Sequence, residues 1–600
     1  MVSSPLHHTF SESMMEENIE IAESIITKWD ANPSSLTRVI SLFGQNRREA
    51  KEYLKCVRGL RGAMHFLVAQ NTGSDKLILA QKLMQMAMKR LEKEFYQILS
   101  SNREQLDPES VSSLSSDGST SFGDEHEIES EDEAELKKAG ASITEVERVS
   151  ALAMSDLKAI AECMSSSGYG KECVKIYKVF RKSIVDRGLY LLGIEKFRSS
   201  RINRMNWEAL EHTVKNWLNA AKIAVKTLFN GEKILCDHVF SASEKIREAC
   251  FAEITMEGAT NVFKFPEIIA KNKKAPERIF RLIELHEAIS ELWPDIETIF
   301  DSQLTSSIKL QALSSLHKVG DSVCTLLSNF KSSIQKDSSK TLAPGGGIHP
   351  LTRSAMSYIS SLSNYGEILS VIIVDHPPKE HSPLPESETP TSIDGPTSAV
   401  SIHLAWLILA LLCKLDRKAE QYKDVSLSYL FLANNLQFII DQVNTSNLKY
   451  LLGDEWVSRH TRKVKQYANS YVSMAWNKVF SSLPERSFAL SPDAVKDCFR
   501  KFNAAFEEAY VKQISWIVPD GKLRDEIKVS IARKLAPAYR EFYETNLVAL
   551  SGEKHLEVLV RVAPDDLGNY LSDLFHGTPF SSSSLSLSSS SAHSRGCLPR

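Results

Sequence analysis

The stretch WEALEHTVKNWLNAAKIAVKTLFNG, residues 207–231, decides the fold class. Its apolar residues recur every three or four positions, which places them on one face of a helix: Trp207, Leu210, Val214, Trp217, Ala221, Val225 and Leu228. The pair Asn230-Gly231 predicts a C-terminal stop for this helix. A helix with one apolar face buries that face against other helices.

The same spacing occurs elsewhere, as in Leu77, Ala80, Met84, Met88, Leu91, Phe95 and Leu99. No proline lies between Pro108 and Pro266 or between Pro396 and Pro484, and such stretches read as helical because proline disrupts helix interiors. Period-two alternation, the mark of strands, is hard to find. The sequence therefore predicts an all-α protein, an elongated rod of consecutive helical bundles.

Composition shifts predict how the chain is divided. Eight of the twelve residues from Asp124 to Glu135 are acidic, a composition typical of disorder. Within that stretch and just before it, Ser130 and Ser121 are candidate phosphorylation sites because each precedes an acidic residue at the third position. The glycines 345–347 predict an exposed turn. The expected parts are an N-terminal helical segment 1–105, a disordered Ser-rich and acidic linker 106–140, first bundles of the rod 141–335, a loop 336–350, a middle bundle 351–480 with a Pro-rich loop 376–398, a C-terminal bundle 481–577, and a disordered tail 578–600.

Neither export nor a membrane span is expected. The first thirty residues are acidic and lack the basic start and apolar block of a signal peptide. The longest apolar run, Leu404–Cys413, is half the length of a membrane span. The nine cysteines contain no CxxC pair and fit reduced thiols of a cytosolic protein.

The usual motifs of catalysis are missing. Gly345-Gly346-Gly347 is followed by Ile348-His349 and not by the Lys-Ser/Thr of a phosphate-binding loop. The chain has no GxSxG, and His286-Glu287 lacks the second histidine of HExxH. We therefore predict that the protein is not an enzyme and holds no cofactor or metal.

Charge is unevenly distributed. The formal net charge of −3 combines −7 over residues 1–400 with +4 over residues 401–600. A basic cluster near the C-terminus comprises Lys522, Arg524, Lys528, Arg533, Lys534 and Arg540, and a smaller one comprises Arg459, His460, Arg462, Lys463 and Lys465. Two interpretations of these basic clusters remain open: they form a solvated helix face, or they contact an anionic surface. No RNA-binding motif or zinc finger accompanies the clusters, so nucleic acid is not an expected partner.

Several strings resemble the seventy-kilodalton subunit family of the exocyst, the vesicle-tethering complex. The most specific is Gly345-Gly346-Gly347-Ile348-His349-Pro350-Leu351-Thr352 with Met356-Ser357-Tyr358-Ile359. Arg90-Leu91-Glu92-Lys93-Glu94-Phe95 with Leu106-Asp107-Pro108-Glu109-Ser110 is similar to the plant branch. Further matches are Ala275-Pro276-Glu277-Arg278-Ile279-Phe280, Tyr429-Leu430-Phe431-Leu432-Ala433-Asn434-Asn435, Leu451-Leu452-Gly453-Asp454-Glu455-Trp456 and Pro537-Ala538-Tyr539-Arg540-Glu541-Phe542-Tyr543.

The resemblance implies a non-enzymatic cytoplasmic protein, peripherally associated with the plasma membrane and secretory vesicles, that tethers these vesicles during exocytosis. Implied partners are other exocyst subunits, an anionic phosphoinositide membrane such as one holding phosphatidylinositol 4,5-bisphosphate, and for some members a Rho-type small GTPase. The implied headgroup contacts are Lys522, Arg524, Lys528, Arg533, Lys534, Arg540 and Arg561. Membrane-binding members often carry two lysines three residues apart before the terminal Pro-Asp-Asp-Leu. Val558 and Arg561 stand at the matching positions here, so one of the two charges is absent. The alternative is an exocyst-derived adaptor in autophagy-related transport or plant defence.

Overall fold

The apolar stripe that begins at Trp207 forms helix α9, Trp207–Ile223, in the computed structural model. Asn206 caps its N-terminus, because the Asn206 side-chain oxygen accepts a hydrogen bond from the main-chain nitrogen of Ala209 at 3.0 Å. Leu210, Val214 and Trp217 are buried, as their spacing predicts. The structure describes residues 12–29, 41–70, 75–102, 151–202, 204–271, 278–377, 384–390, 398–484, 491–547 and 559–577.

The predicted stop at Asn230-Gly231 is wrong. After α9 the chain passes through a π-helical turn, η2, Ala224–Phe229, and continues as α10, Asn230–Val239. Gly231 is buried inside α10, where Leu235, Cys236 and Val239 are buried as well. The burial of these side chains outweighs the weak helix propensity of Asn-Gly, and the π turn absorbs the change in register.

The described residues group into two compact units, which divide between Ser322 and Val323. In unit 1 residues 151–166 are helical, and a long helix, α13, Ser306–Lys336, begins there. The other helical elements of unit 1, besides α9, η2 and α10, are α1 (Glu12–Lys28), α2 (Leu42–Gln45), α3 (Arg47–Gln70), α4 (Asp75–Ser101), α7 (Gly170–Leu191), α8 (Ser199–Ile202), α11 (Glu244–Lys271), α12 (Arg278–Ile299) and η3 (Gln303–Thr305). Helices α1, α3 and α4 pack together, α7 packs on α4 and α11, and α9 packs on α12.

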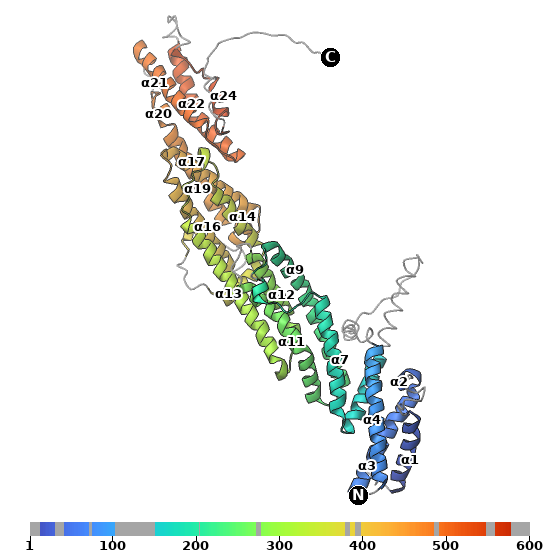
Figure 1. Ribbon diagram of the computed structural model, residues 1–600. Helices are drawn as coiled ribbons and strands as arrows, with labels where there is room; N and C mark the ends of the chain where they lie inside the picture. Colours follow the sequence, from blue (N-terminus) through green and yellow to red (C-terminus); the bar gives the residue numbers. More distant parts are fainter. Residues whose placement is uncertain are drawn as a thin grey trace, which may run out of the picture. The chain divides into compact units, whose positions relative to one another are not determined.

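Unit 2 also consists of helices packed on helices (Figure 1). Helix α17 is central, because it contacts α14, α16, α18 and α19. Helices α20 and α21 pack together, as do α22 and α24. The elements are η4 (Pro344–Gly346), α14 (Pro350–Ser363), α15 (Gly366–Asp375), η5 (Glu386–Glu388), α16 (Ala399–Ala419), α17 (Val425–Asn444), α18 (Leu448–Leu452), α19 (Asp454–Ala475), α20 (Asn477–Ser481), α21 (Pro492–Gln513), α22 (Gly521–Leu547) and α24 (Leu567–Ser572).

The all-α prediction is confirmed. Among the described residues the only β pairing is an isolated bridge between Ile517 and His576. The prolines do not all lie between helices, however: Pro266, Pro294 and Pro537 lie inside α11, α12 and α22.

The acidic linker with Ser121 and Ser130, Val558 and the Ser-rich tail lie outside the described residues, and the module boundaries stay predictions.

Helix α16 contains the longest apolar run of the sequence. With 21 residues it is long and apolar enough to cross a membrane, but most of it is buried inside the protein. Leu404, Leu407, Ile408 and Leu411 are each at most 1% exposed, and α16 contacts α14, α15, α17 and α18. Helix α16 is therefore a core helix of unit 2.

Candidate functional site: the basic helix α22

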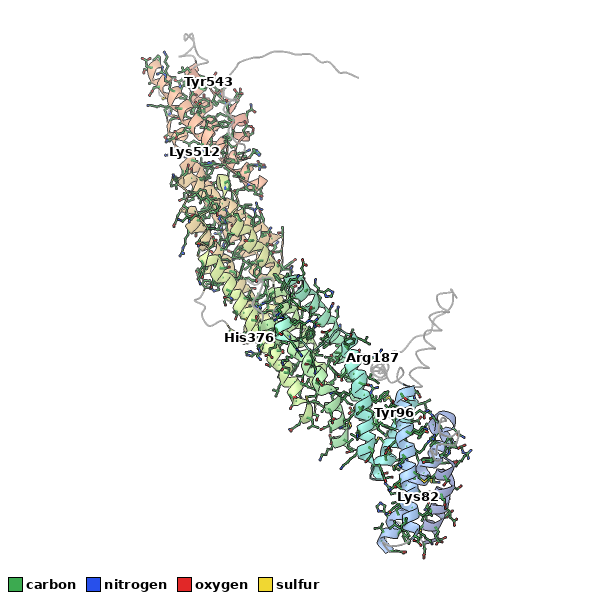
Figure 2. The ribbon with its side chains drawn as sticks, viewed as in Figure 1. Lys82, Tyr96, Arg187, His376, Lys512 and Tyr543 are labelled. Carbon is green, nitrogen blue, oxygen red and sulfur yellow. The ribbon has the colours of Figure 1, made fainter. Side chains whose placement is uncertain are left out.

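Helix α22 carries six of the seven basic residues that the sequence indicates as headgroup contacts, and Arg561 follows it in the chain. Asp520 caps the helix, since the main-chain nitrogen of Leu523 donates to its carboxylate at 2.6 Å. The buried face of α22 consists of Leu523, Ile527, Ile531, Leu535, Tyr539 and Phe542. This buried row leaves the basic residues on the remaining surface of the helix, and Figure 2 marks Tyr543 near its end.

Arg524 and Lys528 lie on the flank of α22 that faces the end of the described chain. Arg524 Nη1 donates to the carbonyl oxygen of Val518 at 3.3 Å. Lys528 Nζ donates to the carbonyl oxygen of Ser572 at 2.6 Å and lies 3.4 Å from His576 Nε2. Burial and the neighbouring charge of Arg524 lower the pKa of Lys528. Lys528 therefore holds the C-terminal segment against α22, whereas Arg524 binds the loop that precedes the helix.

Three further basic residues face acidic or aromatic neighbours. The Lys534 ammonium lies 5.9 Å from the ring centre of Phe480, next to α20. Arg540 pairs with Asp565 at 3.1 Å and Arg561 with Glu507 at 3.3 Å. Both pairs are about half exposed or more. Exposed pairs of this kind contribute about 1 kcal/mol or less, so an anionic ligand can displace them.

Lys522 and Arg533 differ from the others, because neither makes a hydrogen bond or ion pair with any described residue. Both side chains are exposed. They are eleven residues apart, which is three turns of α22, so they share one face about 16 Å apart. Val529, seven positions after Lys522, lies on the same face and is 52% exposed. We name Lys522, Val529 and Arg533 the α22 outer face; two exposed acids, Asp525 and Glu526, lie beside them on the helix.

The structure thus does not bring the seven predicted residues into one patch. Arg524 and Lys528 serve packing, Lys534 lies beside Phe480, and Arg540 and Arg561 are paired. The sequence carries no signal for this division, because it depends on which carbonyl oxygens and acids pack beside each helix position.

Two members of the smaller basic cluster on α19, Arg459 and His460, bind the segment around Glu388. His460 is buried against Glu388, 3.0 Å from its carboxylate, and Arg459 donates to two carbonyl oxygens near Glu388. Arg462 and Lys465 are exposed, and Lys463 lies over the ring of Tyr467.

The glycine-rich motif at residues 345–347 forms a buried junction, and the predicted exposed turn is wrong. Gly346 and Gly347 are buried. Asn434 donates its side-chain amide to the carbonyl oxygens of Gly346 at 2.8 Å and Ile517 at 2.7 Å. Gly345 adopts φ of 58°, and its carbonyl oxygen accepts from the main-chain nitrogen of Ile517 at 2.8 Å. Buried backbone carbonyl groups must be hydrogen-bonded, and the Asn434 side-chain amide supplies these bonds. The glycine turn can therefore be buried.

His349 completes this junction as a capping residue. Its Nδ1 accepts from the main-chain nitrogen of Leu351 at 3.0 Å, and its Nε2 lies 3.0 Å from the carbonyl oxygen of Thr341. The two contacts require a neutral ring with the proton on Nε2. Burial lowers the pKa of His349, in agreement with that tautomer. Two strings that carry the family resemblance, at 345–352 and 429–435, thus bind each other.

Two family models match this chain. The model for the C-terminal part of Exo70, an exocyst complex protein, matches residues 215–573, and the model for the N-terminal part of the exocyst complex component Exo70 matches residues 18–101. The chain belongs to the Exo70 family of exocyst subunits. This membership confirms the family that the sequence predicts. Exocyst subunits are structural proteins of vesicle tethering, so the predictions of a tethering function and of a protein that is not an enzyme are confirmed as well.

Two curated Arabidopsis thaliana relatives of this Exo70-family chain show how far the similarity extends. Exocyst complex component EXO70A1 is 30% identical over 94% of this chain and 89% of its own length. EXO70B1 is 27% identical over 84% of this chain and 80% of its own length. A solved structure of S. cerevisiae Exo70 shares the fold, with a TM-score of 0.60, 18% identity, and coverage of 94% of this chain and 99% of the yeast chain.

Proposed function

We propose that this Exo70-family protein attaches the exocyst to the plasma membrane by binding anionic phosphoinositide headgroups through the α22 outer face. The observation that carries the proposal is that Lys522 and Arg533 are exposed on one face without a partner among the described residues. An exposed valine between two cations also suits the boundary between headgroups and acyl chains. Arg540 and Arg561, in exposed ion pairs, can add to this contact.

The expected affinity of one chain is low. A basic residue close to an anionic leaflet contributes about 1 kcal/mol, so Lys522 and Arg533 supply at most about 2 kcal/mol, which the neighbouring acids reduce. Stable attachment therefore requires several weak contacts made together, from the other exocyst subunits and from more than one headgroup. The proposed partners are accordingly the other exocyst subunits and an anionic membrane.

Liposome flotation of the full chain tests this proposal. The double variant Lys522→Glu/Arg533→Glu is expected to reduce recovery on vesicles that contain phosphatidylinositol 4,5-bisphosphate by about tenfold or more. Recovery of the wild-type chain should also fall as salt screens the charges. The control is Lys336→Glu/Lys340→Glu, which changes the net charge equally at two exposed lysines of unit 2. Equal recovery of the wild type and the α22 variant would reject the site.

A second measurement tests assembly. Affinity capture of the tagged chain from plant extract, followed by mass spectrometry, should recover other exocyst subunits. The α22 variant should recover them equally, since its substitutions lie on the surface proposed for lipid. Autophagy proteins recovered without exocyst subunits would contradict tethering and favour the adaptor role.

A further inference from the structure

A row of basic residues runs along helix α3 of unit 1. It consists of Lys51, Lys55, Arg58, Arg61 and His65, which recur every three or four positions. Residues with this spacing share one face of a helix, and the row covers about 21 Å of its length. All of them except the partly buried Arg61 are exposed. We name these five residues the α3 basic row.

Three cations of the α3 basic row have no partner among the described residues. Lys51, Lys55 and Arg58 make neither a hydrogen bond nor an ion pair with any of them. The two acids of α3 and one acid of the neighbouring helix 151–166 already bind other cations: Glu49 pairs with Lys28 at 3.0 Å, Glu52 with Arg48 at 3.4 Å and Asp156 with Arg47 at 2.7 Å. The row therefore presents three positive charges that remain for an anionic ligand.

The α3 basic row continues into a cleft between α3 and α4, which lie side by side (Figure 1). The cleft has a volume of about 750 Å³ and is bordered by residues 166–169. Arg61 holds this border in place, since its Nη1 donates to the carbonyl oxygen of Ser166 at 2.9 Å. Val68 and Met84 give the cleft apolar walls, and no described carboxylate lines it. A planar bilayer reaches only the rim of such a cleft, whereas an acidic peptide with apolar side chains can enter it.

The chain itself contains a segment of this composition. Eight of the twelve residues from Asp124 to Glu135 are acidic, and none is Lys or Arg. Phe122 and Ile128 supply apolar side chains just before and within this stretch. We name residues 122–135 the acidic segment. Its charge is complementary to the α3 basic row, and its apolar side chains suit the walls of the cleft.

The two ends of the chain that carries the acidic segment lie near the start of α3. Helix α4 ends there, because Glu94 accepts a hydrogen bond from the main-chain nitrogen of Leu42 at 3.1 Å. Helix 151–166 also begins there, since Asp156 pairs with Arg47. The sixteen residues between the acidic segment and that helix can span up to about 50 Å. The acidic segment can therefore reach the whole α3 basic row, at the high local concentration of a tethered ligand.

We propose that the acidic segment binds the α3 basic row and the adjoining cleft of the same chain, and thereby keeps other acidic ligands away from α3. The contact is electrostatic, so it weakens as the ionic strength rises. Ser130, a candidate phosphorylation site, lies within the segment. A phosphate there adds about −1.5 to −2 charge and strengthens the contact, because Arg58 can donate to its oxygens. Phosphorylation of Ser130 thus lowers the availability of α3 to an acidic partner.

Zero-length cross-linking of the full chain tests the contact. A carbodiimide joins a lysine to a carboxylate only where the two touch, so mass spectrometry should find Lys55 linked to the acidic segment. Lys51→Gln/Arg58→Gln keeps Lys55 but should lower the yield of this link about fivefold, through the loss of two exposed charge pairs. The matched control is Lys222→Gln/Lys245→Gln, at two exposed lysines of α9 and α11, which should leave the yield unchanged. Absence of the link, or equal yields in the two variants, would overturn the proposal.

Peptide binding distinguishes an occupied surface from a free one. The probe is a fluorescent peptide of residues 120–136, and the readout is its anisotropy. A full chain with every acid from Asp124 to Glu135 changed to its amide should bind the probe about tenfold more tightly than the wild type, in which the tethered segment competes. The probe phosphorylated at Ser130 should bind this chain about threefold more tightly again. Equal binding of the probe by the two chains, or binding by neither, would contradict docking within the chain.

Liposome flotation separates this contact from a membrane contact of α3. Lys51→Gln/Arg58→Gln should be recovered on vesicles that contain phosphatidylinositol 4,5-bisphosphate as fully as the wild type, because its substitutions lie on a surface that the acidic segment covers. A loss of recovery in this variant would show that the α3 basic row binds lipid, and the proposal would then be wrong.

Discussion

Asn435 and His349 are joined by a buried hydrogen bond across 86 residues of sequence: the His349 main-chain nitrogen donates to Asn435 Oδ1 at 2.9 Å. The same oxygen accepts from Thr352 Oγ1 at 2.7 Å. The Asn435 amide nitrogen donates to the carbonyl oxygens of Gly347 at 3.2 Å and Phe431 at 2.8 Å. One side chain of α17 thus satisfies the start of α14 and the glycine-rich turn before it.

Asn435→Ala is expected to destabilise unit 2 by about 2–4 kcal/mol, since it leaves several buried polar groups without a partner. Urea unfolding of the full chain, followed by exchange of the peptides around 345–352, measures the effect. Asn444→Ala, at an exposed position of the same helix, is the control and should change stability by about 0.5 kcal/mol or less. Equal effects of the two substitutions would contradict the role of Asn435.

Gly345→Ala is expected to destabilise the junction by about 2 kcal/mol or more. Its φ of 58° is unfavourable for alanine, and a Cβ there would lie 2.7 Å from the Ser515 carbonyl oxygen. Exchange of the Ile517 amide, which donates to Gly345, should increase. Gly568→Ala is the matched control because no atom lies within 4 Å of its Cβ, and in α24 it should be neutral or slightly stabilising. Unchanged exchange at Ile517 in Gly345→Ala would disprove the close contact.

How far the sequence predicts this fold depends on the kind of signal. Spacing of Leu77, Met84, Leu91 and Phe95 predicts α4 correctly because burial repeats with the helical period. The glycines 345–347 led to the wrong prediction of an exposed turn, because a glycine-rich composition indicates backbone freedom and says nothing about burial. The side chains that bind this turn belong to Asn434 and Asn435, which are almost ninety residues away in the sequence. Only the packing of α17 determines that contact.

The candidate site shows the same division. The location of the basic residues on one helix follows from their sequence positions, and α22 carries six of them. The use of Lys528 for the Ser572 carbonyl oxygen depends on the path of the C-terminal segment. His460 likewise sits within a basic run but faces Glu388 across 72 residues. Contacts between distant segments therefore decide which charges remain for a ligand.

Arg181→Met is expected to destabilise unit 1 by about 3–5 kcal/mol, because it strands the buried carboxylate of Glu232. Both side chains are 0% exposed and pair at 2.8 Å, and Tyr177 also donates to Glu232, at 3.1 Å. The double variant Arg181→Met/Glu232→Leu should recover most of the loss, since no lone charge remains. Urea unfolding of the three chains measures both steps. A double variant as unstable as the single one would show that the charge pair is not the cause.

Ionised Glu267 is expected to stabilise unit 1, and protonation of Glu267 at low pH is expected to lower the free energy of unfolding. Burial opposes its ionisation, but hydrogen bonds from Lys271, Lys318 and Gln311 outweigh burial and lower the pKa of Glu267 to about 2. A lowered pKa gives stability that is complete above the unfolded pKa of about 4.3 and is lost as the pH falls towards about 2. The loss amounts to at most about 3 kcal/mol. Urea midpoints measured from neutral pH downwards should fall less steeply in Glu267→Gln than in the wild type, whereas Glu291→Gln, an exposed position of α12, should follow the wild type. An acid limb of equal slope in Glu267→Gln would place the sensitive carboxylate elsewhere.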